Sequence, residues 1–309
     1  MAHRISAIVP TIGRAESLAT LLAALAAQTR RPDEVVVADG STNQAVGAVA
    51  HDPRWPAAGL AVRYLHVLPP HAVRQRQAAI ALASGSLLLL LDDDVVPEPG
   101  CVAALEAAVD AGAVGATADF SNQDWPPPTT LWRWYLRMAH GIRGNEWQGR
   151  VIGPLLRFGH NPVPASPAPM EWLGSGNSLI RRDAYDRAGG FSNFFLHRST
   201  VNEDVDLGIK LRRQGALMLC PEARLAHTHA PAGRASVRDV AEDDVYNRYL
   251  ILRRTSGRGA AASRLLMIVF VAIETLSGIS ATVRRRRSND FGARLAGRLS
   301  ALKRIAITP

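Results

Sequence analysis

The first half of the chain alternates short apolar runs with longer segments whose apolar residues recur at helical spacing. Five apolar runs predict strands, at residues 5–9, 34–38, 62–67, 87–91 and 113–118. The run at 87–91 is five consecutive leucines, which is typical of a strand buried on both faces. Helices are predicted between and after these strands, at residues 15–28, 72–83 and 100–111. This alternation predicts an α/β fold with a doubly wound sheet.

The second half is less regular. Residues 119–171 hold four of the six tryptophans and eight prolines, so we expect long functional loops there, with one short helix near residues 131–140. Beyond residue 172 regular elements are predicted again: a glycine-rich turn at 174–177, a short strand after it, helices near 181–188 and 202–214, and a strand at 216–220. Helical patterns continue from residue 237. We therefore expect a first domain at residues 1–240 and a helical C-terminal region at residues 241–309.

The composition is that of a globular protein. Hydrophobic residues make up 47% and charged residues 20% of the 309 residues, which argues against a disordered, collagen-like or disulfide-scaffold protein. The two cysteines, Cys101 and Cys220, lack metal-binding spacing, so we expect a reducing compartment and no structural zinc site. Residues 1–10 lack the pattern of a secretory signal, and we expect a cytoplasmic location.

Three aspartates, Asp92, Asp93 and Asp94, follow directly after the leucine strand. They cannot belong to the core, so we place them at the carboxyl edge of the sheet, where open α/β sheets bind ligands. Adjacent carboxylates repel each other unless a cation neutralises them, and hard divalent cations prefer oxygen ligands. A metal ion that holds a diphosphate is one interpretation of this cluster, and a solvated acidic turn is the other.

Further polar residues belong to the same predicted edge: Pro10, Thr11 and Arg14 after the first strand, Asp39 after the second, and Arg74. Such an edge offers a crevice for a nucleotide, in which Asp39 can accept and Arg74 can donate hydrogen bonds. The chain has neither a Gly-x-x-x-x-Gly-Lys-Ser/Thr loop nor a Gly-x-Gly-x-x-Gly turn. Charge neutralisation of a bound diphosphate is therefore left to a metal ion.

Together these motifs resemble the family 2 glycosyltransferases of the GT-A fold. The resemblance covers residues 5 to about 230, and its motifs are specific only as a set. The matching segments are Ala7-Ile8-Val9-Pro10-Thr11 with Arg14, Pro32 to Ser41, Arg74-Gln75, Ala83-Ser84-Gly85-Ser86, Leu91-Asp92-Asp93-Asp94, Gly176-Asn177-Ser178 with Arg181-Arg182, Gly189-Gly190-Phe191, and Glu203 to Leu207.

The resemblance implies an inverting transfer of a sugar from a nucleotide-diphosphate donor to an acceptor hydroxyl. It implies that Asp39 and Arg74 contact the base and ribose. It also implies that Asp92 and Asp94 form an Asp-x-Asp pair, with Asp94 as the main ligand of Mn²⁺ or Mg²⁺. The residues expected to bind the donor nucleotide are Pro10, Thr11, Arg14, Asp39, Arg74, Asp92 and Asp93. A divalent cation suits the reaction because it stabilises the charge that develops on a diphosphate leaving group.

A second acidic cluster, Glu203-Asp204, begins a predicted helix. An acceptor hydroxyl is a weak nucleophile and needs a carboxylate to take its proton. With the resemblance in view, we assign Asp204 as this base and Glu203 as the residue that orients it or the acceptor. Both acids can also stabilise the first turn of the helix. The family often completes its metal site with a later histidine, and His227 fits that position better than His229.

Three residues mark the expected acceptor side: Trp172, Gly176 and Asn177. Tryptophan rings can stack on sugars or grip a lipid-linked acceptor, because an aromatic face offers apolar area beside hydroxyl partners. We expect acceptor contact at one or two tryptophans, with Trp172 first, among Trp125, Trp132, Trp134, Trp147 and Trp172.

The C-terminal region is basic and partly apolar. Residues 248–309 hold 13 Lys and Arg against two acidic residues, whereas residues 1–247 have a formal charge of −2. Residues 265–283 are long enough to span a bilayer, but Glu274 near their middle costs roughly 2–3 kcal/mol on insertion. We therefore favour an interfacial helix, with Arg284–Arg287 directed at anionic head groups. A helix packed on the protein is the alternative, and nucleic-acid binding is disfavoured because stacking aromatic residues are scarce there.

These expectations combine into a metal-dependent inverting glycosyltransferase that acts on a glycan, polysaccharide or lipid-linked acceptor. We expect it at the inner face of the cell membrane, in envelope polysaccharide synthesis, with peripheral membrane contact through residues 260–290. Two alternatives stay open. One is a sugar-nucleotide nucleotidyltransferase, although its glycine-rich loop is missing near residue 10. The other is a non-catalytic membrane- or RNA-associated binding protein.

Overall fold

The computed structural model describes residues 3–123, 127–153, 156–157, 163–197, 200–229, 235–283 and 290–308. The chain divides into two compact units. Unit 1 comprises residues 1–124, 162–196 and 203–234, and unit 2 comprises residues 125–161, 197–202 and 235–309.

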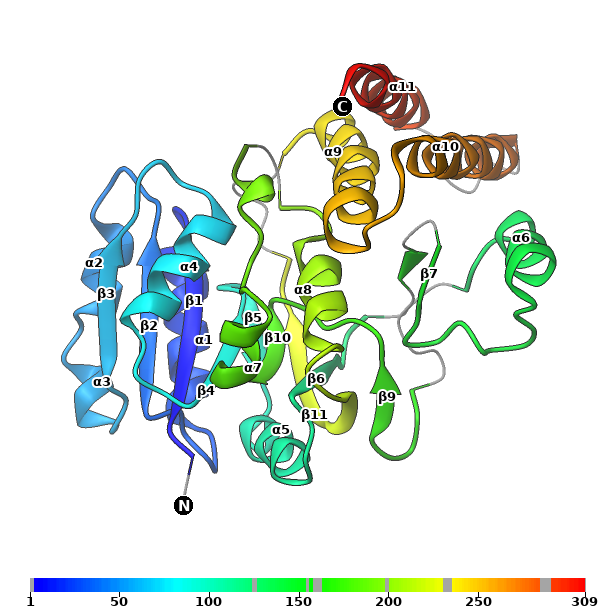
Figure 1. The fold of residues 1–309 in the computed structure, drawn as a ribbon. Helices are drawn as coiled ribbons and strands as arrows, with labels where there is room; N and C mark the ends of the chain where they lie inside the picture. Colours follow the sequence, from blue (N-terminus) through cyan, green and yellow to red (C-terminus); the bar gives the residue numbers. More distant parts are fainter. Residues whose placement is uncertain are drawn as a thin grey trace. The chain divides into compact units, whose positions relative to one another are not determined.

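Unit 1 alternates strands and helices (Figure 1). Its first part runs β1 (Ile5–Thr11), α1 (Ala15–Ala26), β2 (Glu34–Asp39), α2 (Ala45–Ala50), α3 (Arg54–Ala57), β3 (Val62–His66), α4 (Ala72–Leu82) and β4 (Leu87–Leu91). Its second part adds β5 (Val95–Pro97), α5 (Cys101–Asp110), β6 (Gly115–Phe120), β9 (Ala168–Met170), β10 (Asn177–Arg181), α7 (Arg182–Arg187), a 3₁₀ turn (Asn193–His197), α8 (Glu203–Leu211) and β11 (Leu217–His227).

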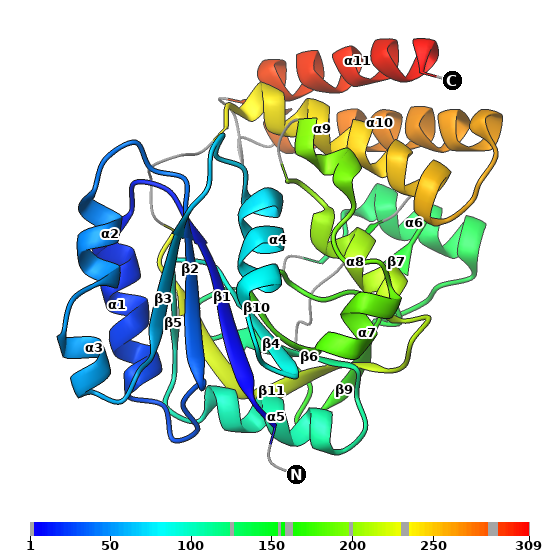
Figure 2. The ribbon, with the colours of Figure 1, turned by 60° about the vertical axis from the view of Figure 1, so that its left-hand side comes forward.

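Among the described residues, nine strands form one mixed sheet in the order β3-β2-β1-β4-β10-β6-β11-β5, with β9 paired to β11. The strands β3, β2, β1 and β4 run parallel, whereas β10 runs antiparallel between β4 and β6. Figures 1 and 2 show α4 on one face of the parallel strands and α1 with α2 on the other. The doubly wound α/β architecture predicted from the sequence is confirmed.

The core of unit 1 lies between the parallel strands and the helices α1 and α5. All five leucines of β4 are at most 1% exposed, which accounts for the uninterrupted apolar run. Alternate residues of β1 (Ile5, Ala7 and Val9) join this core with the leucine stripe of α1, so the strand period and the helix period bury complementary faces.

The strand predicted at residues 216–220 is longer than expected. It continues as β11 to His227, through a register shift between Cys220 and Arg224 that accommodates Pro221. Beyond the shift, β11 pairs with β5, and His227 lies opposite Val95. The extension therefore carries His227 to the residue that follows Asp94.

Unit 2 contains α6 (Thr130–His140), β7 (Val151–Ile152), β8 (Leu156–Arg157), α9 (Val237–Leu250), a π-helical turn (Ile251–Thr255), α10 (Ala260–Val283) and α11 (Phe291–Ile307). The short helix expected near residues 131–140 is confirmed as α6. Thr129 begins it by accepting a hydrogen bond from the Trp132 amide, and Gly141, with φ of 67°, ends it in the left-handed conformation.

The contacts that join the helices of unit 2 include a close approach at a glycine and a charged contact. A Cβ at Gly297 of α11 would lie 2.2 Å from the Arg238 carbonyl oxygen of α9, so only glycine allows the two helices to pack this closely. In α10, the Glu274 carboxylate accepts hydrogen bonds from the Trp132 indole and from Arg298, both at 2.7 Å. Glu274 thus packs α10 against α6 and α11.

Candidate active site

The predicted donor residues lie at the carboxyl ends of the parallel strands. Thr11 and Asp39 end β1 and β2 and are partners in register, and Asp92 follows β4 next to them. The side chain of Gln75 in α4 donates to the carbonyl oxygens of Thr11 and Ala38, at 2.7 and 2.8 Å. This amide fixes α4 against the edge that the sequence predicts as the nucleotide crevice.

Asp93 is bound by residues of β1 and the loop after it. Its two carboxylate oxygens accept from Thr11 Oγ1 at 2.7 Å and from Arg14 Nη1 at 2.9 Å. Burial raises the pKa of Asp93 above its ordinary value, although Thr11 and Arg14 both stabilise the ionised form. Arg14 also lies 3.3 Å from Asp94, so one guanidinium neutralises two of the three aspartates.

Asp94 faces a histidine. Its Oδ1 lies 3.0 Å from Nε2 of His227, and Gln123 Nε2 lies 2.8 Å from the other ring nitrogen of His227 and 3.0 Å from Nε2 of His229. The two histidine rings are 4.1 Å apart between centroids. Of the two candidate histidines, the structure places His227 against Asp94 and His229 against Gln123.

Asp94 Oδ1 and His227 Nε2 lie at hydrogen-bond distance, 3.0 Å, which is also the separation expected for two adjacent ligand atoms about 2.1 Å from an octahedral cation. Asp92, predicted as a further ligand, is not brought to this pair. In the described part of the chain no three His, Cys, Asp or Glu side chains gather to hold a metal ion, so other oxygens would have to complete its shell.

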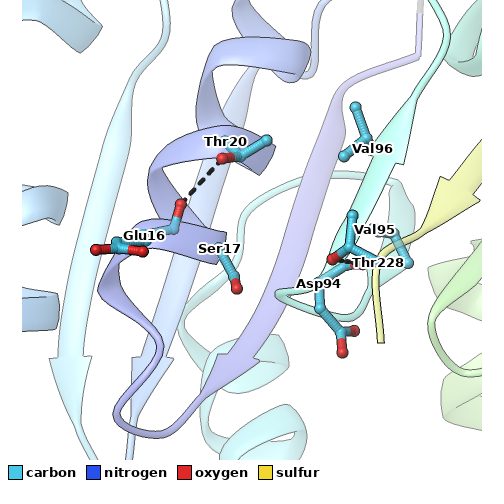
Figure 3. A pocket seen from close by; sticks show the side chains of 7 residues that line it. All are labelled: Glu16, Ser17, Thr20, Asp94, Val95, Val96 and Thr228. Carbon is cyan, nitrogen blue, oxygen red and sulfur yellow. Dashed lines mark hydrogen bonds between the residues drawn. The ribbon is translucent and has the colours of Figure 1, made fainter. Parts of the chain in front are cut away.

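A cavity of about 250 Å³ opens beside Asp94 (Figure 3). It is lined by Glu16, Ser17 and Thr20 of α1, by Asp94, Val95 and Val96, and by Thr228. Thr228 donates from both its amide and its hydroxyl to the Asp94 carbonyl oxygen, at 2.8 and 3.0 Å. This fixes the Asp94 backbone and leaves the carboxylate at the cavity wall.

Asp39 is fully buried. Its Oδ1 accepts from the amide and hydroxyl of Ser41, and its Oδ2 accepts from the Tyr64 hydroxyl at 2.9 Å. Burial and this hydrogen bond raise the pKa of Tyr64 to about 12. Arg74, its expected partner at the base and ribose, donates to the Pro69 carbonyl oxygen at 2.7 Å rather than to another predicted donor residue.

Asp92 is turned toward the second acidic cluster. Its Oδ1 accepts from Arg76 Nη2 at 2.6 Å, and Arg76 Nη1 donates to Glu203 Oε1 at 3.2 Å. A Cβ at Gly176 would lie 2.2 Å from Asp92 Oδ2, so a larger residue there would displace this carboxylate from its present position. The two acidic clusters, 111 residues apart between Asp92 and Glu203, thus meet at one guanidinium.

Glu203 and Asp204 form the first turn of α8, and both are buried. Asp204 Oδ1 accepts from the Val205 amide at 2.8 Å, a contact that stabilises the helix start. Burial and the adjacent Asp204 charge raise the pKa of Glu203 to about 7, although Arg76 and Ser175 stabilise its ionised form. Ser175 Oγ donates to Glu203 at 2.8 Å.

The expected acceptor-side residues lie near this turn but are enclosed. Asn177 begins β10 beside Leu91 and donates to the Ala118 carbonyl oxygen at 2.6 Å, while its buried Oδ1 has no hydrogen-bond partner among the described residues. Trp172 is only 4% exposed, and Gly208 of α8 packs on its backbone. Trp134 of α6 is 61% exposed, and Trp125 lies outside the described residues.

Three contributors were not singled out from the sequence: Arg76, Ser175 and Gln123. Arg76 follows the Arg74-Gln75 motif in a helix whose other charged and polar residues mask it. Ser175 lies inside the predicted glycine-rich turn, where only its position next to Gly176 offered a signal. Gln123 lies in the tryptophan-rich segment and carries no signal that separates it from its neighbours.

Comparison with known proteins assigns the family. A sequence model described as Glycosyl transferase family 2 matches residues 6–161, half of the chain. The chain belongs to glycosyl transferase family 2. It is therefore a glycosyltransferase, and the match covers β1 to β6 with the three adjacent aspartates, but not Glu203-Asp204.

Two curated relatives are similar over most of this chain. The O-antigen biosynthesis protein RfbC of Myxococcus xanthus is 28% identical over 263 residues, which is 81% of this chain but 19% of that protein. The N-acetylglucosaminyl-diphospho-decaprenol L-rhamnosyltransferase of Mycobacterium tuberculosis is 26% identical over 287 residues, 87% of this chain and 91% of that protein. The chain thus spans about a fifth of RfbC and most of the mycobacterial relative.

Two solved glycosyltransferase structures are similar in fold to this chain. The mannosyltransferase PcManGT from Pyrobaculum calidifontis, in complex with GDP-Man and Mn²⁺, superimposes with a TM-score of 0.57 at 15% identity, over 99% of this chain and 87% of that chain. S. aureus TarS 1-349 in complex with UDP-GlcNAc gives a TM-score of 0.55 at 14% identity, over 98% and 82%. The GT-A fold expected from the sequence is confirmed.

Proposed function

We propose that this family 2 glycosyltransferase moves a sugar, with inversion, from a nucleotide-diphosphate donor to an acceptor hydroxyl, and that unit 1 carries the chemistry. One observation supports this most: Asp92, from the aspartate cluster at the end of β4, and Glu203, from the start of α8, are bound to the same Arg76 guanidinium. A donor held by the first cluster and a proton acceptor in the second would then serve one reaction.

The donor-binding part of the proposal assigns the nucleotide to the edge formed by β1, β2 and β4. Its residues would be Pro10, Thr11, Arg14, Asp39, Arg74, Asp92 and Asp93. Arg14 already neutralises Asp93 and Asp94, and a guanidinium in that position can also bind phosphate oxygens. The donors named with the similar structures, GDP-Man and UDP-GlcNAc, are both sugar nucleotides.

We assign Asp94 and His227 as the residues that hold Mn²⁺ or Mg²⁺. When bound, such a cation stabilises the negative charge of a departing diphosphate as a Lewis acid. Gln123 would orient the His227 ring from its far side, as outer-shell partners do at metal sites. His229 shares Gln123 but is not against Asp94, so we assign it no metal role.

Asp204 is the proposed base that takes the proton of the acceptor hydroxyl. It lies in the first turn of α8 next to Glu203, whose pKa of about 7 allows Glu203 to be ionised at neutral pH and above. A charged neighbour stabilises the proton that Asp204 takes up. Glu203 would thus assist Asp204 without abstracting the proton itself.

We propose a lipid-linked acceptor in the synthesis of an envelope polysaccharide. The two relatives support it by name, since one is an O-antigen biosynthesis protein and the other acts on a decaprenol-linked sugar. Trp172, Gly176 and Asn177 remain our proposed acceptor-side residues. Trp172 is 4% exposed, so only a small part of it is available for contact with an acceptor.

We further propose peripheral contact with the inner membrane face through residues 260–290. Within the described residues, α10 is the helix long and apolar enough to span a bilayer, over Ala260–Ser280 with a mean hydropathy of 1.7. Four residues at helical spacing form an exposed apolar stripe on it: Leu265, Ile268, Leu276 and Ile279. Glu274 is bound to α6 and α11 instead, so one face is committed to protein, which favours an interfacial helix. Arg284–Arg287 lie outside the described residues.

The test is a panel of nucleotide sugars, each measured with and without Mn²⁺. A donor should raise the midpoint of thermal unfolding only with the metal, because a ligand that binds the native state stabilises it by mass action. The same donor should be hydrolysed slowly, and it should be transferred when a polyprenyl-diphosphate sugar is added. Protection without hydrolysis or transfer by any donor would contradict the proposed function and favour a binding protein.

A further inference from the structure

Arg76 connects two parts of the site that neither the sequence motifs nor the family match joins. It belongs to α4, yet its guanidinium reaches Asp92 after β4 with Nη2 and Glu203 in α8 with Nη1. The three residues come from three elements separated by 16 and 127 positions along the chain. We propose that Arg76 is a positioning residue that ties the donor-side aspartates to the catalytic acid pair; this inference rests on the proposed function.

The burial of Arg76 supports a role beyond stability. Its side chain is 4% exposed, and its Nε has no hydrogen-bond partner among the described residues. Taking a guanidinium out of water is costly, and an incompletely bonded buried ion pair adds little to the free energy of unfolding. The buried Arg76 guanidinium is better explained by a need to hold the carboxylates of Asp92 and Glu203 together at a reaction centre.

The surroundings of Arg76 keep its guanidinium in place. It lies 5.9 Å from the centre of the Phe191 ring, within cation–π distance. Gly190 has a φ of +58°, and a Cβ there would lie 2.7 Å from the Tyr185 ring, so the Gly189-Gly190 turn requires glycine. Gln77 of α4 donates to the Phe191 carbonyl oxygen at 3.0 Å. The Gly-Gly-Phe motif thus places the Phe191 ring beside Arg76.

The charges around Glu203 determine what the loss of Arg76 would do. Among the described residues, those that face Glu203 are Arg76 from α4 and Asp204 from its own helix; Asp92 reaches it through Arg76, and Ser175 offers a neutral hydroxyl. Arg76 is the cation of this set. Without it, burial and Asp204 would hold the Glu203 proton to higher pH, because an opposite charge at this range lowers a carboxyl pKa by about 1–3 units.

The first measurement is the pH profile of transfer for Arg76→Met and Arg76→Lys. In Arg76→Met we expect kcat/KM at pH 7 to fall about 10- to 100-fold and the acidic limb of the profile to move up by about 1–3 pH units. Arg76→Lys should recover part of the rate and should show a smaller shift of the acidic limb. An ammonium group keeps the positive charge but cannot bind two carboxylates with the forked geometry of a guanidinium. In a Glu203→Gln background, adding Arg76→Met should not move the acidic limb, because the group whose pKa Arg76 lowers is no longer present.

Arg182→Met is the matched control. This substitution also removes a part-buried guanidinium. In the wild type, the Arg182 guanidinium donates to the carbonyl oxygens of Ile80, Ala83 and Gly85, none of which is a proposed site residue. We expect a lower unfolding midpoint for it and an unmoved pH profile. If Arg76→Met behaves in the same way, the positioning role is wrong and Arg76 is only structural.

A second measurement keeps the test independent of activity. Because the folded-state pKa of Glu203, about 7, lies above its ordinary value of 4.5, the stability from its protonated form is present at low pH and is lost as pH rises toward 7. In Arg76→Met the decline of the unfolding midpoint should continue to higher pH than in wild type. A wild type that transfers no sugar would contradict the proposed function, whereas an unchanged decline in Arg76→Met would contradict this inference.

Discussion

At the scale of residues, each of the three aspartates after β4 is bound by a side chain from another part of the chain. Arg14 binds Asp93 and Asp94, His227 faces Asp94, and Arg76 binds Asp92. Buried charges need such partners, because an unpaired charge in the interior costs several kcal/mol. The partners distinguish Asp94, which faces Arg14 and His227, from Asp92, which faces Arg76.

The two histidines give a matched test of the metal assignment. His227→Ala should raise the Mn²⁺ concentration for half-maximal donor hydrolysis by at least about 10-fold, the loss typical when even the outer shell of a metal site is disturbed. His229→Ala should change it much less, because His229 contacts Gln123 and not Asp94. The two variants are compared by titration with Mn²⁺, followed by donor hydrolysis and by thermal unfolding. Equal effects, or a larger effect of His229→Ala, would contradict the assignment.

Glu34 provides a test of stability away from the site. Burial favours its neutral form, but hydrogen bonds from Ser84, Ser6 and Arg63 hold the pKa of Glu34 at about 2. A carboxyl with a lowered pKa stabilises the fold above its ordinary pKa of 4.5, and this contribution is lost as pH falls toward 2. Glu34→Gln should therefore lower the free energy of unfolding by about 2–3 kcal/mol at pH 7.

The control for Glu34 is Asp183, whose pKa is also lowered to about 2, by hydrogen bonds from Arg181 and Arg187. Its side chain is 46% exposed, so water screens these contacts and Asp183→Asn should cost less than about 1 kcal/mol. Urea denaturation at pH 7 and pH 3 measures both variants. The account of Glu34 fails if the two losses are equal at pH 7, or if the Glu34→Gln loss does not shrink at pH 3.

At the scale of elements, the close packing of α8 positions the acid pair. A Cβ at Gly208 would lie 2.7 Å from the Trp172 Cα, a backbone atom that cannot rotate away. Gly208→Ala should push α8 from the 172–173 segment, lowering the free energy of unfolding by about 1–3 kcal/mol and slowing transfer. Gly292 of α11 has open space around it, so Gly292→Ala should be neutral or stabilising by up to about 1 kcal/mol. Denaturation curves that rank the two variants the other way would contradict this packing.

Most elements of unit 1 follow from the sequence, because strand and helix periods decide which residues can be buried. The leucine run of β4 and the leucine stripe of α1 are examples. Local pattern did not reveal the extension of β11, since Pro221 reads as a strand end and only the shift against β6 lets the strand continue to His227. The short helices α2 and α3 were missed because four to six residues carry too little periodic signal.

The site residues that follow directly after a predicted strand could be predicted from the sequence. Asp39 and the three aspartates after β4 lie at the edge expected from their position. The bridge through Arg76 was not, because it depends on a contact across 127 positions that no local pattern encodes. The sequence also did not show that His227 would face Asp94 while Asp92 faces Arg76, because both contacts join residues that no local pattern links.

At the scale of the whole molecule, the tryptophan-rich segment and the C-terminal helices belong to the same compact unit. Residues 125–161 are grouped with 235–309, and Trp132 packs on Phe270 of α10 at 5.8 Å between ring centroids. Unit 2 therefore combines aromatic residues, an exposed apolar stripe and the chain's excess positive charge. This composition suits the membrane contact proposed for it.

The membrane proposal is tested by flotation with liposomes that contain anionic lipid. Replacing Leu265, Ile268, Leu276 and Ile279 by Ser should abolish flotation, because the stripe supplies the buried apolar area. The control replaces residues on the buried face of α10 by other apolar residues of similar size. Met267→Leu is one such replacement, because the Met267 side chain is fully buried. If the stripe variant floats as wild type does, the stripe is not the lipid contact.

The central claim is that two acidic clusters serve one transfer, one through the donor and the other through the acceptor. Donor binding and sugar transfer should therefore be measured in parallel for Asp94→Asn and Asp204→Asn. We predict that Asp94→Asn loses both Mn²⁺-dependent thermal protection by the donor and transfer. Asp204→Asn should keep the protection while transfer falls about 10²- to 10⁴-fold, the contribution of a general base. Full transfer by Asp204→Asn, or unchanged metal-dependent protection of Asp94→Asn, would contradict the account.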